Sequence, residues 1–194
     1  MAFGFSSVEL RDLAISVLAL GFAFNMALNH GNLAMFPQTL FIIVIAFAAH
    51  EVIGHKLVAQ HFGYFAEYRM WTYGLVIALA SSFLGFIFAA PGAVYISPVR
   101  KKFAFRVARI TERENGIISL GGPAVNIVLG FAMVFAAFAL PAFAWLFFPA
   151  AQISFWLAIF NLIPFPPLDG SKVLAWSKPA WILAAIAAGV GFMI

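Results

Sequence analysis

The chain contains no cysteine, and it contains few charged residues. The absence of cysteine excludes a disulfide framework, a thiolate metal site and a thiol nucleophile. Charged residues make up 9% of the 194 residues and hydrophobic residues 64%, whereas about 25% of a typical soluble domain is charged. This balance excludes an ordinary soluble domain. We therefore expect an all-α polytopic membrane protein in which residues 1–194 form a single integral membrane domain.

Acidic residues are scarcer than basic ones, which gives a formal net charge of +4. A basic balance can indicate nucleic-acid binding, but here the basic residues lie beside apolar stretches, where they set topology and contact lipid headgroups. We expect the lipid bilayer, and no nucleic acid, as a partner. The apolar run at 13–29 is too long for a signal sequence, and no small-residue cleavage pattern follows it. The first span is therefore expected to remain as an anchor.

Five apolar stretches approach the roughly 20 residues that a helix needs to cross a bilayer. These predicted spans, of which the last is short, cover about 10–29, 37–59, 116–140, 145–164 and 179–194. A further apolar stretch, 73–97, is interrupted by Ser81-Ser82 and ends in APGAVYISP. This stretch is the ambiguous part of the topology.

Charge resolves that ambiguity. If 73–97 enters and leaves the membrane on one side, all eleven basic residues fall on or towards one side, including the cluster at 100–113. The positive-inside rule makes that side cytoplasmic and places the amino terminus there, in a protein of the cell membrane. We therefore predict a re-entrant or membrane-dipping β-hairpin segment at about 73–97, which lipid tolerates when it is buried against protein.

Ionisable residues at membrane depth are costly and almost always functional, and the stretch AFAAHEVIGHKLVAQHF carries several. Its His50-Glu51 and His55 resemble the zincin pattern His-Glu-x-x-His, but with one residue more between the histidines. On a regular α-helix, positions five apart point about 140° from each other. A π-bulge would restore convergence, and Gly54 is a plausible place to absorb it. Alternatively, His55 is an interfacial histidine beside Lys56, and no site forms.

A second ionisable residue, Asp169, closes the apolar segment NLIPFPPLDG. Three prolines break the helix here and free backbone groups that only protein or a cavity can satisfy. Two histidines and one carboxylate leave the fourth position of zinc open for water, as in a catalytic site. Alternatively, Asp169 caps the last helix, with Gly170-Ser171 beside it.

Four segments, HEVIGHKLVAQHFG, FAAPGAVYI, SLGGPAVNIVLG and NLIPFPPLDG, occur in this order along the chain. Together they resemble the site-2 protease family of intramembrane zinc metalloproteases, and the likeness is closest to the small archaeal-type members without a PDZ domain. The resemblance covers about 50–175. The ordered set is far more specific than any one motif.

The resemblance implies a role for six residues. By match, the ligands of Zn²⁺ are His50, His55 and Asp169, the catalytic base is Glu51, and the substrate-binding residues are Asn161 and Asn126.

Such enzymes cut transmembrane segments of membrane-anchored substrates near the cytoplasmic face, which agrees with the topology above. A transmembrane protein substrate is accordingly the expected partner. The alternative is a catalytically inactive, protease-like scaffold that binds partner helices, because HEVIGH has one residue too many. A transporter is less favoured, since no paired inverted repeats are visible.

Overall fold

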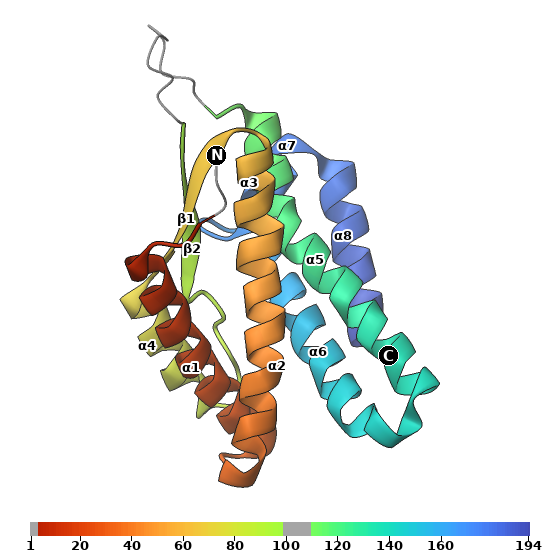
Figure 1. The fold of residues 1–194 in the computed structure, drawn as a ribbon. Helices are drawn as coiled ribbons and strands as arrows, with labels where there is room; N and C mark the ends of the chain where they lie inside the picture. The colour runs from red at the N-terminus through yellow and green to blue at the C-terminus, as the bar shows by residue number, and fades with distance from the viewer. Residues whose placement is uncertain (1–3, 99–109) are drawn as a thin grey trace, which may run out of the picture.

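A computed structural model describes residues 4–98 and 110–194 of the protein (Figure 1). Most of these residues are helical, and four helical stretches are long and apolar enough to cross a membrane. They are α1 (Ser7–Asn29), a continuous stretch over Leu33–His61, α5 (Glu112–Ala139) and a stretch over Pro141–Asn161. The expectation of a polytopic helical protein is confirmed at this level.

Two of these stretches are composite. The second consists of the 3₁₀-helix η1 (Leu33–Met35), α2 (Phe36–Ala48), the π-helix η2 (Ala49–Leu57) and α3 (Val58–His61). The fourth consists of the 3₁₀-helix η3 (Pro141–Phe143) and α6 (Ala144–Asn161). A proline stands in the first turn of α2 and in the first turn of η3, where its missing N–H costs no hydrogen bond.

The chain ends in two shorter helices, α7 (Asp169–Trp176) and α8 (Lys178–Phe192). Ser177 caps α8 by accepting a hydrogen bond from the N–H of Ala180. With 15 residues, α8 is apolar but shorter than the four candidate spans. The fifth predicted span therefore stays a prediction.

The segment predicted as a re-entrant hairpin, 73–97, has a different structure. It contains the helix α4 (Thr72–Ser82) and the strand β2 (Gly92–Pro98). The antiparallel partner of β2 is β1 (Tyr64–Met70), which precedes the predicted segment. The alternation of apolar and charged residues over 66–70, AEYRM, was a usable strand signal in the sequence. Met70 and Gly92 are paired in the sheet, so the chain between them begins and ends at the same end of the sheet.

A single column of helix, from α2 to α3, divides the molecule (Figure 1). The sheet, α1 and α4 lie on one side of it, and α5, α6 and α8 lie on the other. Buried apolar side chains of α1, α2, α4 and α6 form the largest core, in which the Phe47 ring meets the Tyr68 ring edge-on at 5.6 Å. This core fixes the sheet against α2.

The basic cluster predicted at 100–113 lies mostly outside the described residues. Another residue counted as a topology signal, Lys56, is 1% exposed and forms an ion pair with Glu9. Its side chain therefore points into the protein and not towards lipid headgroups.

Candidate metal centre

The extra residue between the two histidines is accommodated by a π-helix. The segment η2 continues α2 and α3 without a break, and the predicted departure from α-helical geometry is confirmed. Hydrogen bonds from i to i+5 widen each turn by one residue, so the fifth residue along comes to lie where the fourth lies in an α-helix. The rings of His50 and His55 consequently stack edge-on with centroids 4.8 Å apart. Both side chains are buried.

Glycines let α5 approach η2 at this point. A Cβ on Gly54 would lie 2.6 Å from the backbone nitrogen of Gly122 and 2.7 Å from the carbonyl oxygen of Gly121. A Cβ on Gly122 would lie 2.6 Å from His50 Nε2 and would also collide with His55 Nε2. Gly54 is thus needed for the close approach of two helices, and Gly122 for the space that the two imidazoles fill.

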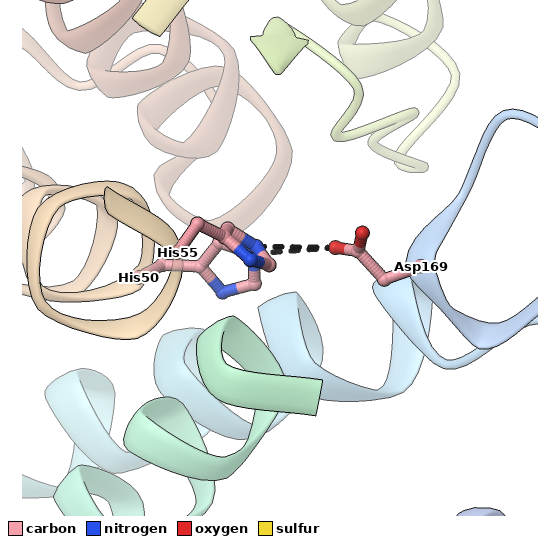
Figure 2. Close-up of side chains that lie close together, drawn as sticks. All are labelled: His50, His55 and Asp169. Carbon is pink, nitrogen blue, oxygen red and sulfur yellow. Dashed lines mark hydrogen bonds and ion pairs between the residues drawn. The ribbon is translucent and has the colours of Figure 1, made fainter. Parts of the chain in front are cut away.

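The third donor comes from the far end of the chain. Asp169 Oδ2 lies 3.2 Å from His55 Nε2 and 4.0 Å from His50 Nε2, and the two Nε2 atoms lie 3.1 Å apart (Figure 2). Donors bound tetrahedrally to zinc at its usual bond lengths stand about 3.3 Å apart. Among the described residues, these three form the one group of metal-capable side chains that could hold an ion.

Asp169 does not cap a helix as the alternative reading proposed. It is the first residue of α7, while Leu168 occupies the capping position, and its carboxylate points at the histidines (Figure 2). Lys172 Nζ lies 3.3 Å from the second carboxylate oxygen. Burial by itself raises the pKa of Asp169, but the charges of His55 and Lys172 outweigh it and hold the pKa below its ordinary value.

Both imidazoles are held through Nδ1 by α5. His55 Nδ1 lies 2.9 Å from the carbonyl oxygen of Ile118, and His50 Nδ1 lies 3.0 Å from Nδ2 of Asn126. Asn126 Oδ1 is buried and has no hydrogen-bond partner. With a metal on Nε2, Nδ1 of His50 carries the ring proton. If the side-chain amide of Asn126 is rotated by 180°, its Oδ1 accepts a hydrogen bond from that N–H. The orphaned oxygen therefore fits a metal-bound His50.

The resemblance implied that Asn126 contacts substrate, and the structure places it elsewhere. It is fully buried behind His50 and does not line the cavity beside the histidines. The contact between Asn126 and His50 was not predicted, because the spacing within GGPAVN does not show which residue of another helix Asn126 faces.

A cavity of about 310 Å³ opens at the centre. Its wall includes the three metal-capable residues, Glu51, Asn161 and residues 92–96 of β2. Glu51 is 5% exposed, and its Oε2 has no hydrogen-bond partner. Asn161 Nδ2 donates a hydrogen bond to the carbonyl oxygen of Leu157 at 2.9 Å. A buried carboxylate without a partner, beside a candidate metal site, is free to exchange a proton with a molecule in the cavity.

The sequence analysis also did not predict the ion pair of Lys56, the residue that follows His55. Lys56 Nζ lies 2.5 Å from Oε2 of Glu9, and both side chains are buried. A signal was present, because Lys56 stands inside an apolar span, where an unpaired ammonium is costly. A third histidine of the same helical stretch, His61, is exposed and does not line the cavity.

Fold and site together define a class: a helical protein with several candidate membrane spans and a two-histidine, one-carboxylate centre beside a buried glutamate. The chain is 34% identical over 198 residues to "Putative zinc metalloprotease MJ0611" of Methanocaldococcus jannaschii, with 99% of this chain and 96% of the relative covered. It is 25% identical over 187 residues to "Putative zinc metalloprotease YwhC" of Bacillus subtilis, with 84% of this chain and 80% of the relative covered. No protein-family model and no solved structure matches the chain. The protein belongs to the zinc metalloprotease family of these relatives.

Proposed function

We propose that this protein is a zinc-dependent intramembrane endopeptidase that cleaves transmembrane segments of membrane-anchored substrates near the cytoplasmic face. The observation that carries the proposal is the convergence of His50, His55 and Asp169 beside the unpartnered carboxylate of Glu51. These three residues would hold the zinc ion. The membrane location of the cut is supported by the position of both histidines within a candidate membrane span.

The chain's own residues divide the chemistry between them. When bound, a zinc ion would supply Lewis-acid polarisation of the scissile carbonyl and would lower the pKa of a water molecule. Glu51 would accept a proton from the attacking water and would later deliver that proton to the leaving amine. Asn126 and the carbonyl of Ile118 hold the two imidazoles in place, so that only Nε2 faces the ion.

Strand β2 is the natural place for the substrate backbone. A helical peptide hides its carbonyls in its own hydrogen bonds, so a transmembrane substrate must become extended before it can be cut. β2 pairs with β1 along one edge, and no strand among the described residues pairs with its other edge. An extended segment added there would run along the cavity wall. Asn161, in the same wall, would donate or accept a hydrogen bond with it.

The alternative of an inactive scaffold was based on the extra residue in HEVIGH. Because the turn of η2 is widened by one residue, that spacing is no obstacle to a two-histidine site. No feature of the described residues favours the scaffold over the enzyme.

Metal content and cleavage test the proposal together. Purified wild type should contain about one zinc per chain, as expected for one catalytic site, and His50→Ala should contain almost none. Glu51→Gln should keep its zinc but lose cleavage of a transmembrane peptide in proteoliposomes by about 10²–10⁴-fold, the usual contribution of a general base. Equal, near-zero zinc in wild type and His50→Ala would refute the metal site. Full zinc with no cleavage by the wild type would favour the scaffold.

Orientation is tested separately. Single cysteines placed at Arg69, and at Arg100 outside the described residues, are probed in sealed vesicles with an impermeant thiol reagent. The native chain has no cysteine to interfere. Both positions should react from the cytoplasmic side. Reaction from opposite sides would mean that the intervening chain crosses the membrane, and the cytoplasmic placement of the centre would fail.

A further inference from the structure

A buried ion pair involves the residue that follows His55. Lys56 follows His55 in η2, and its ammonium contacts Glu9 Oε2 at 2.5 Å and the carbonyl oxygen of Gly4 at 2.8 Å. The ammonium also lies 4.1 Å from the centroid of the Phe5 ring. Both partners of the pair are 1% exposed. Because desolvation offsets much of the attraction in a buried pair, such a pair is weak support for stability, and its geometry requires another explanation.

The same glutamate also holds the sheet. Glu9 Oε1 accepts the backbone N–H of Tyr68 at 3.0 Å, and one turn later Asp12 Oδ2 accepts the N–H of Met70 at 3.2 Å. Tyr68 and Met70 are alternate residues of β1, so their N–H groups point to one edge, the edge away from β2. The tyrosine hydroxyl is also fixed, at 2.8 Å from Oγ of Ser16. The first turns of α1 thereby close the outer edge of β1.

Glu9 thus links η2 to the sheet. The cavity is lined by the histidines of η2 and by β2, and β2 is paired with β1. The Glu9 side chain contacts η2 through Lys56 with one carboxylate oxygen, and it contacts β1 through the N–H of Tyr68 with the other.

The ion pair depends on the π-helical form of η2. A π-helix is rarer than an α-helix, and relaxation of η2 to α-helical bonding would rotate the residues beyond it by about 100° relative to α2. That rotation would carry Lys56 away from Glu9, which is held on α1 and β1. It would also turn His55 away from His50. The Lys56–Glu9 ion pair and the approach of His55 to His50 therefore both require the π-helical form of η2.

We infer that Glu9 and Lys56 are positioning residues: their buried pair holds η2 in the form that aligns His55 with His50 and sets the distance between the metal centre and the sheet. This inference rests on the proposed function, because alignment matters only if the centre binds metal.

The test compares zinc affinity with thermal stability. Zinc affinity of the full chain in detergent is measured by competition with a chromophoric chelator, for wild type, Glu9→Gln, Lys56→Met and the double variant. Each single variant leaves a buried charge unpaired and should be less stable. The double variant replaces both charges by neutral side chains of similar shape, so its Tm should recover. Its zinc affinity should nevertheless stay about tenfold or more below wild type, as for other changes just outside the ligands.

Two control variants separate positioning from general stability. Thr39→Val removes a buried hydroxyl that accepts a hydrogen bond from Asn29 at 3.0 Å, at the other end of the α1–α2 pair. It should lower Tm and leave zinc affinity unchanged. Asp12→Asn weakens the hold on β1 without touching Lys56, so it should raise KM for a transmembrane peptide while zinc affinity stays that of wild type.

The outcomes distinguish this inference from the proposed function. If wild type binds zinc and the double variant binds it equally tightly, the positioning role is refuted and the protease proposal stands. If Thr39→Val loses zinc in parallel with Tm, the effect is one of stability and the positioning role is again refuted. If wild type binds no zinc, both proposals fail.

Discussion

The two helices that build the candidate centre do so by opposite means. The η2 segment presents two donor side chains and departs from α-helical geometry to bring them onto one face. Helix α5 stays α-helical over 28 residues, in spite of Pro123, and beside the two Nε2 atoms it presents the backbone of Gly122. A metal site within a helical bundle therefore needs space as well as donors. An extra residue in one helix supplies the convergence, and missing side chains in the other supply the space.

The largest effect should follow from filling that space on α5. Gly122→Ala places a Cβ against both Nε2 atoms, so the imidazoles must move and zinc binding should be lost. Overpacking of this kind also costs about 1–3 kcal/mol of stability. Elemental analysis and thermal unfolding measure the two effects.

Gly189→Ala in α8 is the matched control, because an added Cβ there meets no atom within 4 Å. It should keep its zinc and gain up to about 1 kcal/mol from helix propensity. Full zinc content in Gly122→Ala would show that the approach of α5 does not shape the centre.

A smaller effect is expected where α5 supports a donor of η2. Asn126→Ala removes the side chain that contacts His50 Nδ1, and zinc affinity should fall by about 10–100-fold while one zinc still binds at saturation. Asn25→Ala removes an equally buried amide at the other end of the molecule. Its stability should fall, but its zinc affinity should not. If the two variants bind zinc alike, Asn126 does not orient the histidine.

The smallest effect should follow from shortening η2 itself. Deleting Ile53, which is 53% exposed, restores the ordinary spacing of His-Glu-x-x-His, and the widened turn can become α-helical with its flanks still in phase. Zinc affinity and cleavage should be retained or improved, with some loss of packing.

Deleting Phe41, 54% exposed in the α-helical part of the same span, is the informative contrast. No widened turn there can absorb the change, so everything beyond it rotates by about 100° and zinc binding should be abolished. Equal loss of zinc in both deletions would mean that the π-helical form itself is required.

Much of the site follows from local pattern. The apolar spans, the ionisable residues inside them and the need for a widened turn between His50 and His55 can all be read along one helix, because helical periodicity relates side chains a few residues apart. The proline-rich break before Asp169 is likewise a local feature. For the same reason, β1 could have been predicted from its alternation, although its pairing with β2 could not.

The donor side chains, and the need for their helix to depart from α-helical geometry, follow from the amino-acid sequence. The surroundings of these side chains depend on tertiary packing: Gly54 lies against α5, Asn126 contacts His50, and Glu9 lies between Lys56 and β1. Each of these contacts joins residues more than 45 positions apart in the chain. Helical and strand periodicities describe one element at a time, whereas these contacts depend on how separate elements pack, so no spacing within a single segment could reveal them.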